Sequence, residues 1–134
     1  MSTYGAVRSL CILMLATLSA ALSSTVAADT FASVHYEAQT DQLVATMIYM
    51  GTNPDHAFTV QWGACQAPSQ GGQIQEITAD VLDSQWDDAA IRTYRKTVRF
   101  SVANLSCRPA KLTLRTAPRF LYTLLIPQAP GAAR

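Results

Sequence analysis

The fold of this protein is decided between residues 33 and 50, which read SVHYEAQTDQLVATMIYM. On each side of a short polar break, apolar side chains recur at every second position. This is the period of a β-strand, whose successive side chains point to opposite faces. The stretch therefore predicts two antiparallel strands, over 33–39 and 42–50, joined by a two-residue turn at Thr40-Asp41.

The apolar residues also predict how these two strands pair. If Tyr36 faces Ala45, then the other apolar side chains also meet along one face of the hairpin. A slip of one residue would turn all of them toward solvent, so the register is well specified. The inward face of the second strand would carry Leu43, Ala45, Met47 and Tyr49.

The same alternation continues as far as Pro127. Further strands are predicted over 57–64, 74–82, 93–102, 110–116 and 119–127, with turn residues between them. Seven short strands predict an all-β fold, an antiparallel two-sheet sandwich of immunoglobulin-like proportions. The resemblance is one of architecture only. Immunoglobulin domains place a Trp on the strand after the first cysteine, whereas Trp62 precedes Cys65 and Trp86 lies in a loop.

Residues 1–28 are predicted to be a cleavable signal peptide. Arg8 is the only charge before an apolar run over 10–22, and small side chains precede the expected cleavage after Ala28. The run is shorter than the about 20 residues that a membrane-spanning helix needs. We therefore expect an exported protein, periplasmic if the host is bacterial and secreted otherwise. Its sandwich domain would span 29–127, and a disordered tail would follow over 128–134.

Export leaves two cysteines, because Cys11 lies within the signal peptide. A pair of cysteines in an oxidising compartment predicts one disulfide, between Cys65 and Cys107. In the chain-entropy model, closing a loop of this length contributes about 4 kcal/mol of stability. Two free thiols or a metal pair are the alternative, but no Cys-x-x-Cys spacing accompanies these residues.

Acidic and basic residues occupy different parts of the chain. Every acid lies between Asp29 and Asp88, and every base after the signal peptide lies between Arg92 and Arg134. The mature chain has no basic excess, which argues against a nucleic-acid partner. It also has no apolar run long enough to insert into a membrane.

To explain this segregation we predict that the fourth and fifth strands form a hairpin. Asp80 would then face Arg95, and Glu76 would face Arg99. Opposite charges across a ladder favour one register over a slipped one. Pairing the fifth strand with the sixth would instead oppose Arg99 and Arg115, so those two strands are expected in different sheets.

Few residues could carry chemistry. His35, Glu37 and His56 could bind zinc or copper, and His56 beside Asp55 could act as a general base in a hydrolytic protein. No nucleophile or metal motif accompanies them, so we predict no cofactor and no catalytic residue. A histidine in a Pro-containing turn is ordinarily solvated, and we expect His56 to be exposed.

Residues 83–88, DSQWDD, form an acidic loop without the spacing of a calcium-binding EF-hand. We expect a solvated turn with Trp86 folded back on the sandwich. An exposed Trp86 would instead mark a contact residue, because Trp is enriched in binding hot spots.

The predicted strands over 42–50 and 119–127 are apolar on both faces. A strand of a sandwich normally has one polar face that is exposed to water. Their outward residues predict an exposed apolar patch, and such patches mark interfaces. The alternative is that the loop over 66–73 or the acidic loop covers it. The predicted partner-binding residues are Val44, Ile48, Met50, Leu121, Leu125 and Trp86.

The sequence therefore predicts an exported, non-enzymatic binding domain. Its partner would be a protein, self-association included. One alternative is a metal-binding or hydrolytic protein centred on His35 and His56. Another is a structural subunit of a surface assembly, which completes a neighbour's sheet by strand addition.

Overall fold

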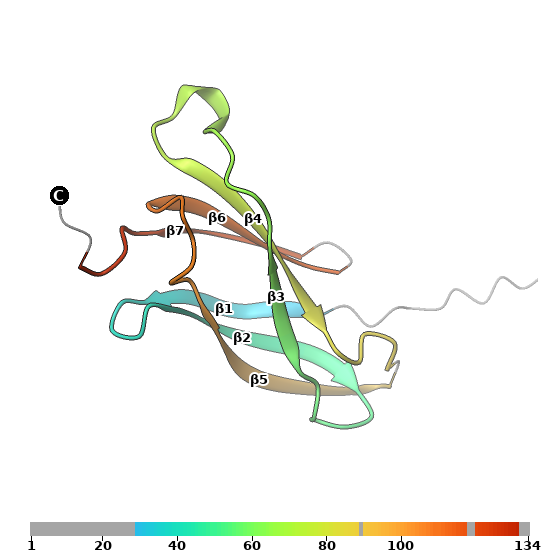
Figure 1. Cartoon of the computed structure of the whole chain (residues 1–134). Helices are drawn as coiled ribbons and strands as arrows, with labels where there is room; N and C mark the ends of the chain where they lie inside the picture. The colour runs from blue at the N-terminus through green and yellow to red at the C-terminus, as the bar shows by residue number, and fades with distance from the viewer. Residues whose placement is uncertain (1–28, 89, 118–119, 132–134) are drawn as a thin grey trace, which may run out of the picture.

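The computed structural model describes residues 29–88, 90–117 and 120–131, and these form two packed layers of strands (Figure 1). The predicted all-β, two-sheet architecture is confirmed. The predicted signal peptide and the last three residues of the predicted tail lie outside the described residues. In chain order the elements are β1 (Thr30–Glu37), β2 (Gln42–Gly51), β3 (Phe58–Trp62), the 3-10 helix η1 (Ser69–Gly71), β4 (Gln75–Asp83), β5 (Arg92–Ser101), β6 (Ala110–Thr116) and β7 (Phe120–Ile126).

The three-stranded sheet has the order β1-β2-β5, and the four-stranded sheet has the order β3-β4-β6-β7. The chain crosses between the sheets from β2 to β3, from β4 to β5 and from β5 to β6. Placing β5 and β6 in different sheets is therefore confirmed. In immunoglobulin sandwiches the third strand lies beside the sixth. Here β4 takes that place and runs parallel to β6, whereas the other pairs are antiparallel.

The β1–β2 hairpin forms, but its predicted register is wrong by two residues. Tyr36 pairs with Leu43 rather than Ala45, and the chain reverses over residues 38–41 instead of a two-residue turn. Asp41 adopts a left-handed backbone conformation (φ 53°), which a short polar side chain tolerates better than most. A two-residue shift keeps every side chain on its face, so the inward row of β2 is as predicted and is buried.

The predicted β4–β5 hairpin is wrong. β5 pairs with β2, and the segment after β4 carries the chain to the other sheet. Asp80 pairs with Arg115 of β6 instead of Arg95, with Asp80 Oδ1 2.7 Å from Arg115 Nε. Glu76 similarly lies beside Lys111 rather than Arg99, whose partner is Glu37 of β1. Exposed ion pairs of this kind contribute little to stability, because solvent screens them. The charge segregation thus reflects pairing of early acids with late bases, but across different strands.

The space between the sheets is filled by the inward rows of both. These buried apolar side chains form one continuous core, which joins the two sheets. Its members are Val34, Leu43, Ala45, Met47, Tyr49, Ile77, Ala79, Val81, Phe100, Val102, Cys107, Ala110, Leu112, Leu114 and Ile126.

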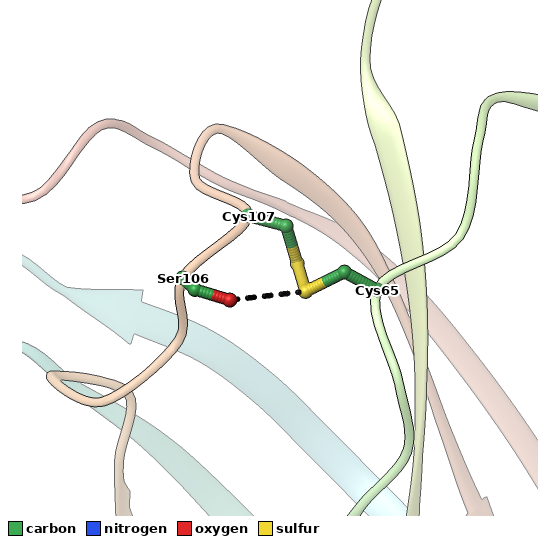
Figure 2. Close-up of a disulfide and its surroundings, with 3 residues drawn as sticks. All are labelled: Cys65, Ser106 and Cys107. Carbon is green, nitrogen blue, oxygen red and sulfur yellow. Dashed lines mark hydrogen bonds between the residues drawn. A yellow bond between two sulfur atoms is a disulfide. The ribbon is translucent and has the colours of Figure 1, made fainter.

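The predicted disulfide between Cys65 and Cys107 is confirmed (Figure 2). It joins the connection that follows β3 to the crossing that leads into β6. Ser106 Oγ lies 3.6 Å from Cys65 Sγ. No helix within the described ranges is long and apolar enough to span a membrane.

Candidate functional site

His56 is fully buried in the β2–β3 crossing, so its predicted exposure is wrong. The end of β4 and the acidic loop close over the ring. Its Nδ1 lies 2.6 Å from Asp83 Oδ2, and its Nε2 lies 3.3 Å from Asp88 Oδ2. Because a carboxylate oxygen can only accept, both ring nitrogens act as donors, and the ring is an imidazolium. His56 therefore connects the β2–β3 crossing to the β4–β5 crossing.

The electrostatics agree with this protonation state. Burial lowers the pKa of His56, but hydrogen bonds to Asp83 and Asp88 and their charges outweigh it and raise that pKa above its ordinary value. Hydrogen bonds from the Thr52 backbone N–H, 2.6 Å away, and from the Thr52 hydroxyl help to lower the pKa of Asp88. Burial and the neighbouring charge of Asp83 raise the pKa of Asp29 to about 6.

The surroundings of the ring are closely packed. The ring of Tyr49 lies 4.7 Å from that of His56, and its hydroxyl donates to the Pro54 carbonyl at 2.7 Å. Lys96 Nζ donates to the His56 carbonyl at 2.7 Å. A Cβ on Gly51 would overlap the imidazole and approach Asp88 Oδ2 to 2.9 Å, so only glycine leaves room for the ring here.

The predicted metal or hydrolytic site is not assembled. His35 is exposed on β1, Glu37 is bound to Arg99 and Thr40, and His56 is enclosed by aspartates in a different part of the fold. Among the described residues, no group of three or more His, Cys, Asp or Glu side chains could hold a metal ion. Because both ring nitrogens of His56 are hydrogen-bonded and the ring is buried, it cannot act as a general base toward a substrate.

A second buried charge, which the sequence did not indicate, lies at the opposite end of the sandwich. The Arg108 guanidinium makes a two-pronged contact with the Asp41 carboxylate, with both N–O distances 2.8 Å. It also donates to the Tyr36 hydroxyl at 3.1 Å and to the Pro127 carbonyl at 2.9 Å. The hydrogen bond from Arg108, helped by one that the Tyr36 hydroxyl donates to Asp41 Oδ1 at 2.8 Å, lowers the pKa of Asp41. Arg108 therefore connects the β5–β6 crossing to the β1–β2 turn and to the end of β7.

The predicted apolar patch does not exist as one surface, because its residues lie in different sheets. Val44 is buried, and Ile48 and Met50 are partly buried on β2, the central strand of the three-stranded sheet. Leu121 and Leu125, by contrast, are 64% and 54% exposed on β7. Trp86 is 69% exposed, so its expected packing against the sandwich is wrong.

The outer face of the four-stranded sheet has two shallow hollows beside these leucines. One, of about 610 Å³, is lined by Asp80, Leu82, Arg115 and Leu121 among others. The other, of about 450 Å³, is lined by Ile74, Glu76, Lys111 and Leu125 among others. Each hollow therefore combines an ion pair with an exposed leucine. Between them Thr113 faces Thr123 in the β6–β7 ladder.

The edge strands differ in how well they are protected against pairing with another chain. Short length, charge, proline and bulges are the usual protection. β3 is short, β5 carries four basic residues, and β1 has a register irregularity between Phe31 and Ser33. β7 has seven uncharged residues, FLYTLLI, with no proline and a regular register. Among the described strands, only β6 hydrogen-bonds to β7, so the edge of β7 that faces away from β6 has no partner strand.

No protein-family model matches this chain, and no match was found among curated proteins or solved structures.

We predict that His56 makes the free energy of unfolding fall as pH rises above about 6.5. Its folded pKa is above its unfolded value, so its contribution is complete below about pH 6.5 and is lost as pH rises through the folded pKa. Urea unfolding at pH 6 and pH 9 measures this. His35→Gln, which alters an exposed histidine, should keep the wild-type loss. His56→Gln should be less stable at pH 6 and show a smaller loss. Equal pH dependence in both variants would contradict the buried imidazolium.

We also predict that Gly51→Ala destabilises the protein by about 1–3 kcal/mol, the usual cost of overpacking. The added methyl would displace the imidazole from Asp88. The matched control is Gly72→Ala, whose Cβ would meet its nearest neighbour, Pro68 Cβ, at 3.4 Å. Its effect should stay within about 0.5 kcal/mol, as for surface substitutions. Denaturant unfolding compares the two, and similar effects would show that the Gly51 contact is unimportant.

Proposed function

We propose that this protein is an exported, non-enzymatic interaction domain, and that a protein partner adds a β-strand along the free edge of β7. The main support is that β7, unlike the other described edge strands, has no feature that resists pairing: it carries no charge, its register is regular and it is not short. Strand addition gives affinity through backbone hydrogen bonds and specificity through alternate side chains.

The outer face beside β7 supports this mode of binding. Leu121 and Leu125 are four residues apart, about 13 Å along a strand, so an added strand would contact both. The neighbouring hollows could take side chains of the partner that point to the same face. The Asp80–Arg115 and Glu76–Lys111 pairs join β4 to β6, next to the leucines of β7. There they would orient polar groups of the partner at the rim of the interface.

Export is supported by two independent features. Residues 1–28 have the charge, apolar run and small residues of a signal peptide. The Cys65–Cys107 disulfide is compatible with an oxidising compartment, where such bonds persist. In a surface assembly the partner would be a neighbouring subunit, and the same edge would serve.

Site-specific photo-crosslinking in the exporting cell tests the β7 interface. A photoreactive residue at position 125 should give one discrete adduct, and the same residue at position 91 should give none. Ile91 is a suitable control because it is an exposed apolar residue away from β7. Adding Leu121→Lys should weaken the adduct about tenfold or more, because a charge on an edge strand opposes pairing.

The adduct mass identifies the partner, and twice the chain mass would indicate a second copy. No adduct from position 125, an equal adduct from position 91, or an adduct insensitive to Leu121→Lys would each overturn the β7 proposal.

A further inference from the structure

The outward side chains of β4, β6 and β7 form three rows across the four-stranded sheet. The middle row consists of Thr78, Thr113 and Thr123. Each flanking row has an acid on β4, a base on β6 and a leucine on β7. These rows are Glu76, Lys111 and Leu125 on one side, and Asp80, Arg115 and Leu121 on the other. The outer face therefore has nearly the same chemistry on both sides of the threonine row.

The free edge of β7 has the same symmetry. Its outward side chains are Leu121, Thr123 and Leu125, so this face of the strand reads alike in both directions. In a two-fold dimer, each copy presents the same surface patch to the other. If β7 pairs antiparallel with β7 of a second copy and Thr123 faces its equivalent, Leu121 of each chain faces Leu125 of the other. The outward face of β7 is therefore complementary to itself.

The ends of β7 favour this register over its neighbours. It aligns all seven residues of β7 with those of the second copy. The ladder ends at Ile126, before Pro127, which has no N–H to donate. A shift of two residues in either direction would place Leu121 or Leu125 opposite Thr123. The apolar pattern and the proline therefore select the same register.

This pairing brings no like charges together. On the inward face Tyr122 would lie opposite Leu124, and both are only partly buried in a single chain. On the outward face the bases of β6, Lys111 and Arg115, lie one strand behind β7, and each has an acidic neighbour on β4. Bases of the two copies would be three strand spacings apart, about 14 Å. That separation exceeds the Debye length of about 8 Å at physiological ionic strength.

The hollows beside β7 would each gain a wall from the second copy. Leu125 of the second copy would lie next to Leu121, at the hollow of about 610 Å³. Leu121 of the second copy would lie next to Leu125, at the hollow of about 450 Å³. Leucine surface that is exposed in a single chain would leave water at both places, which supplies the hydrophobic part of the interface.

We infer that the protein added along β7 is a second copy of this chain. The two copies are related by a two-fold axis at Thr123, and their four-stranded sheets join into one. The inference rests on the proposed function, because it names the partner of the same edge. A two-fold contact is closed, so it occupies the free edge of both copies and leaves neither to recruit further chains. Self-pairing thus covers the described edge strand that has no protection of its own.

Sedimentation equilibrium of the protein purified from the exporting cell tests whether it dimerises through β7. We expect a dimer that dissociates on dilution. Leu121→Lys places a charge opposite Leu125 in both halves of the dimer and should raise the dissociation constant at least about tenfold. Ile91→Lys changes an exposed residue away from β7 and should leave the dissociation constant unchanged. A wild-type chain that remains monomeric at about 1 mM would overturn the inference.

A second charge distinguishes self-pairing from pairing with any other protein. In the double variant Leu121→Lys with Leu125→Glu, each lysine would face a glutamate of the second copy, and opposite charges across a ladder are favourable. This variant should dimerise more tightly than Leu121→Lys alone. The control, Leu121→Lys with Leu125→Lys, should dimerise no better than the single variant. Equal dissociation constants for the two double variants would contradict the proposed register.

Engineered cysteines locate the two-fold axis. Directly opposed residues of antiparallel strands have Cα atoms about 4.5–5.5 Å apart, within the range that a disulfide spans. Thr123→Cys should therefore give a disulfide-linked dimer when the purified protein is mildly oxidised. Thr113→Cys should not, because its copies would be about 14 Å apart. A mixture of Leu121→Cys and Leu125→Cys proteins should crosslink, whereas neither should do so alone.

Peptide mapping of these variants verifies that the Cys65–Cys107 bond is retained. Equal crosslinking of Thr113→Cys and Thr123→Cys, or none from Thr123→Cys, would overturn the placement of the axis.

The photo-crosslink at position 125 separates this inference from the proposed function. An adduct of twice the chain mass supports both. An adduct with a different protein, together with a monomeric purified chain, supports the β7 interface and overturns self-pairing. The absence of any adduct overturns both.

Discussion

Two buried charged side chains, His56 and Arg108, hold together the crossings that make this chain a sandwich. A chain that passes between two sheets carries polar backbone and charged groups into places where water cannot reach them. The imidazolium of His56 joins the β2–β3 crossing to Asp83 and Asp88 around the β4–β5 crossing. At the other end, Arg108 joins the β5–β6 crossing to Asp41 and to the carbonyl of Pro127. Removing one partner of such a pair is destabilising, because it leaves the other charge uncompensated.

The strands and their inward faces could be predicted from the sequence because both depend on a local period of two. Strand partners could not, because Asp80 is as compatible with Arg95 as with Arg115. The β1–β2 register was wrong because a shift of two residues preserves every face, so the apolar pattern fits both registers. The two buried clusters had no sequence signal: Arg108 and Asp41 are 67 positions apart, and His56 and Asp83 are 27 apart.

The strand residues predicted to form one interaction surface lie in two different sheets. Apolar residues on both faces of a strand have different causes in β2 and β7. β2 is central, and its outward Val44 is buried beneath its neighbours. β7 is an edge, and its outward leucines stay exposed. Strand order therefore decides which apolar residues are available to a partner, and that order depends on contacts distant in sequence.

The protonation state of His56 tests most directly whether a buried imidazolium joins the first two crossings. A ¹⁵N NMR spectrum of the imidazole at neutral pH should show protons on both ring nitrogens, and the ring should titrate above its ordinary value of about 6.5. A neutral ring at that pH, with a proton on one nitrogen only, would contradict the account.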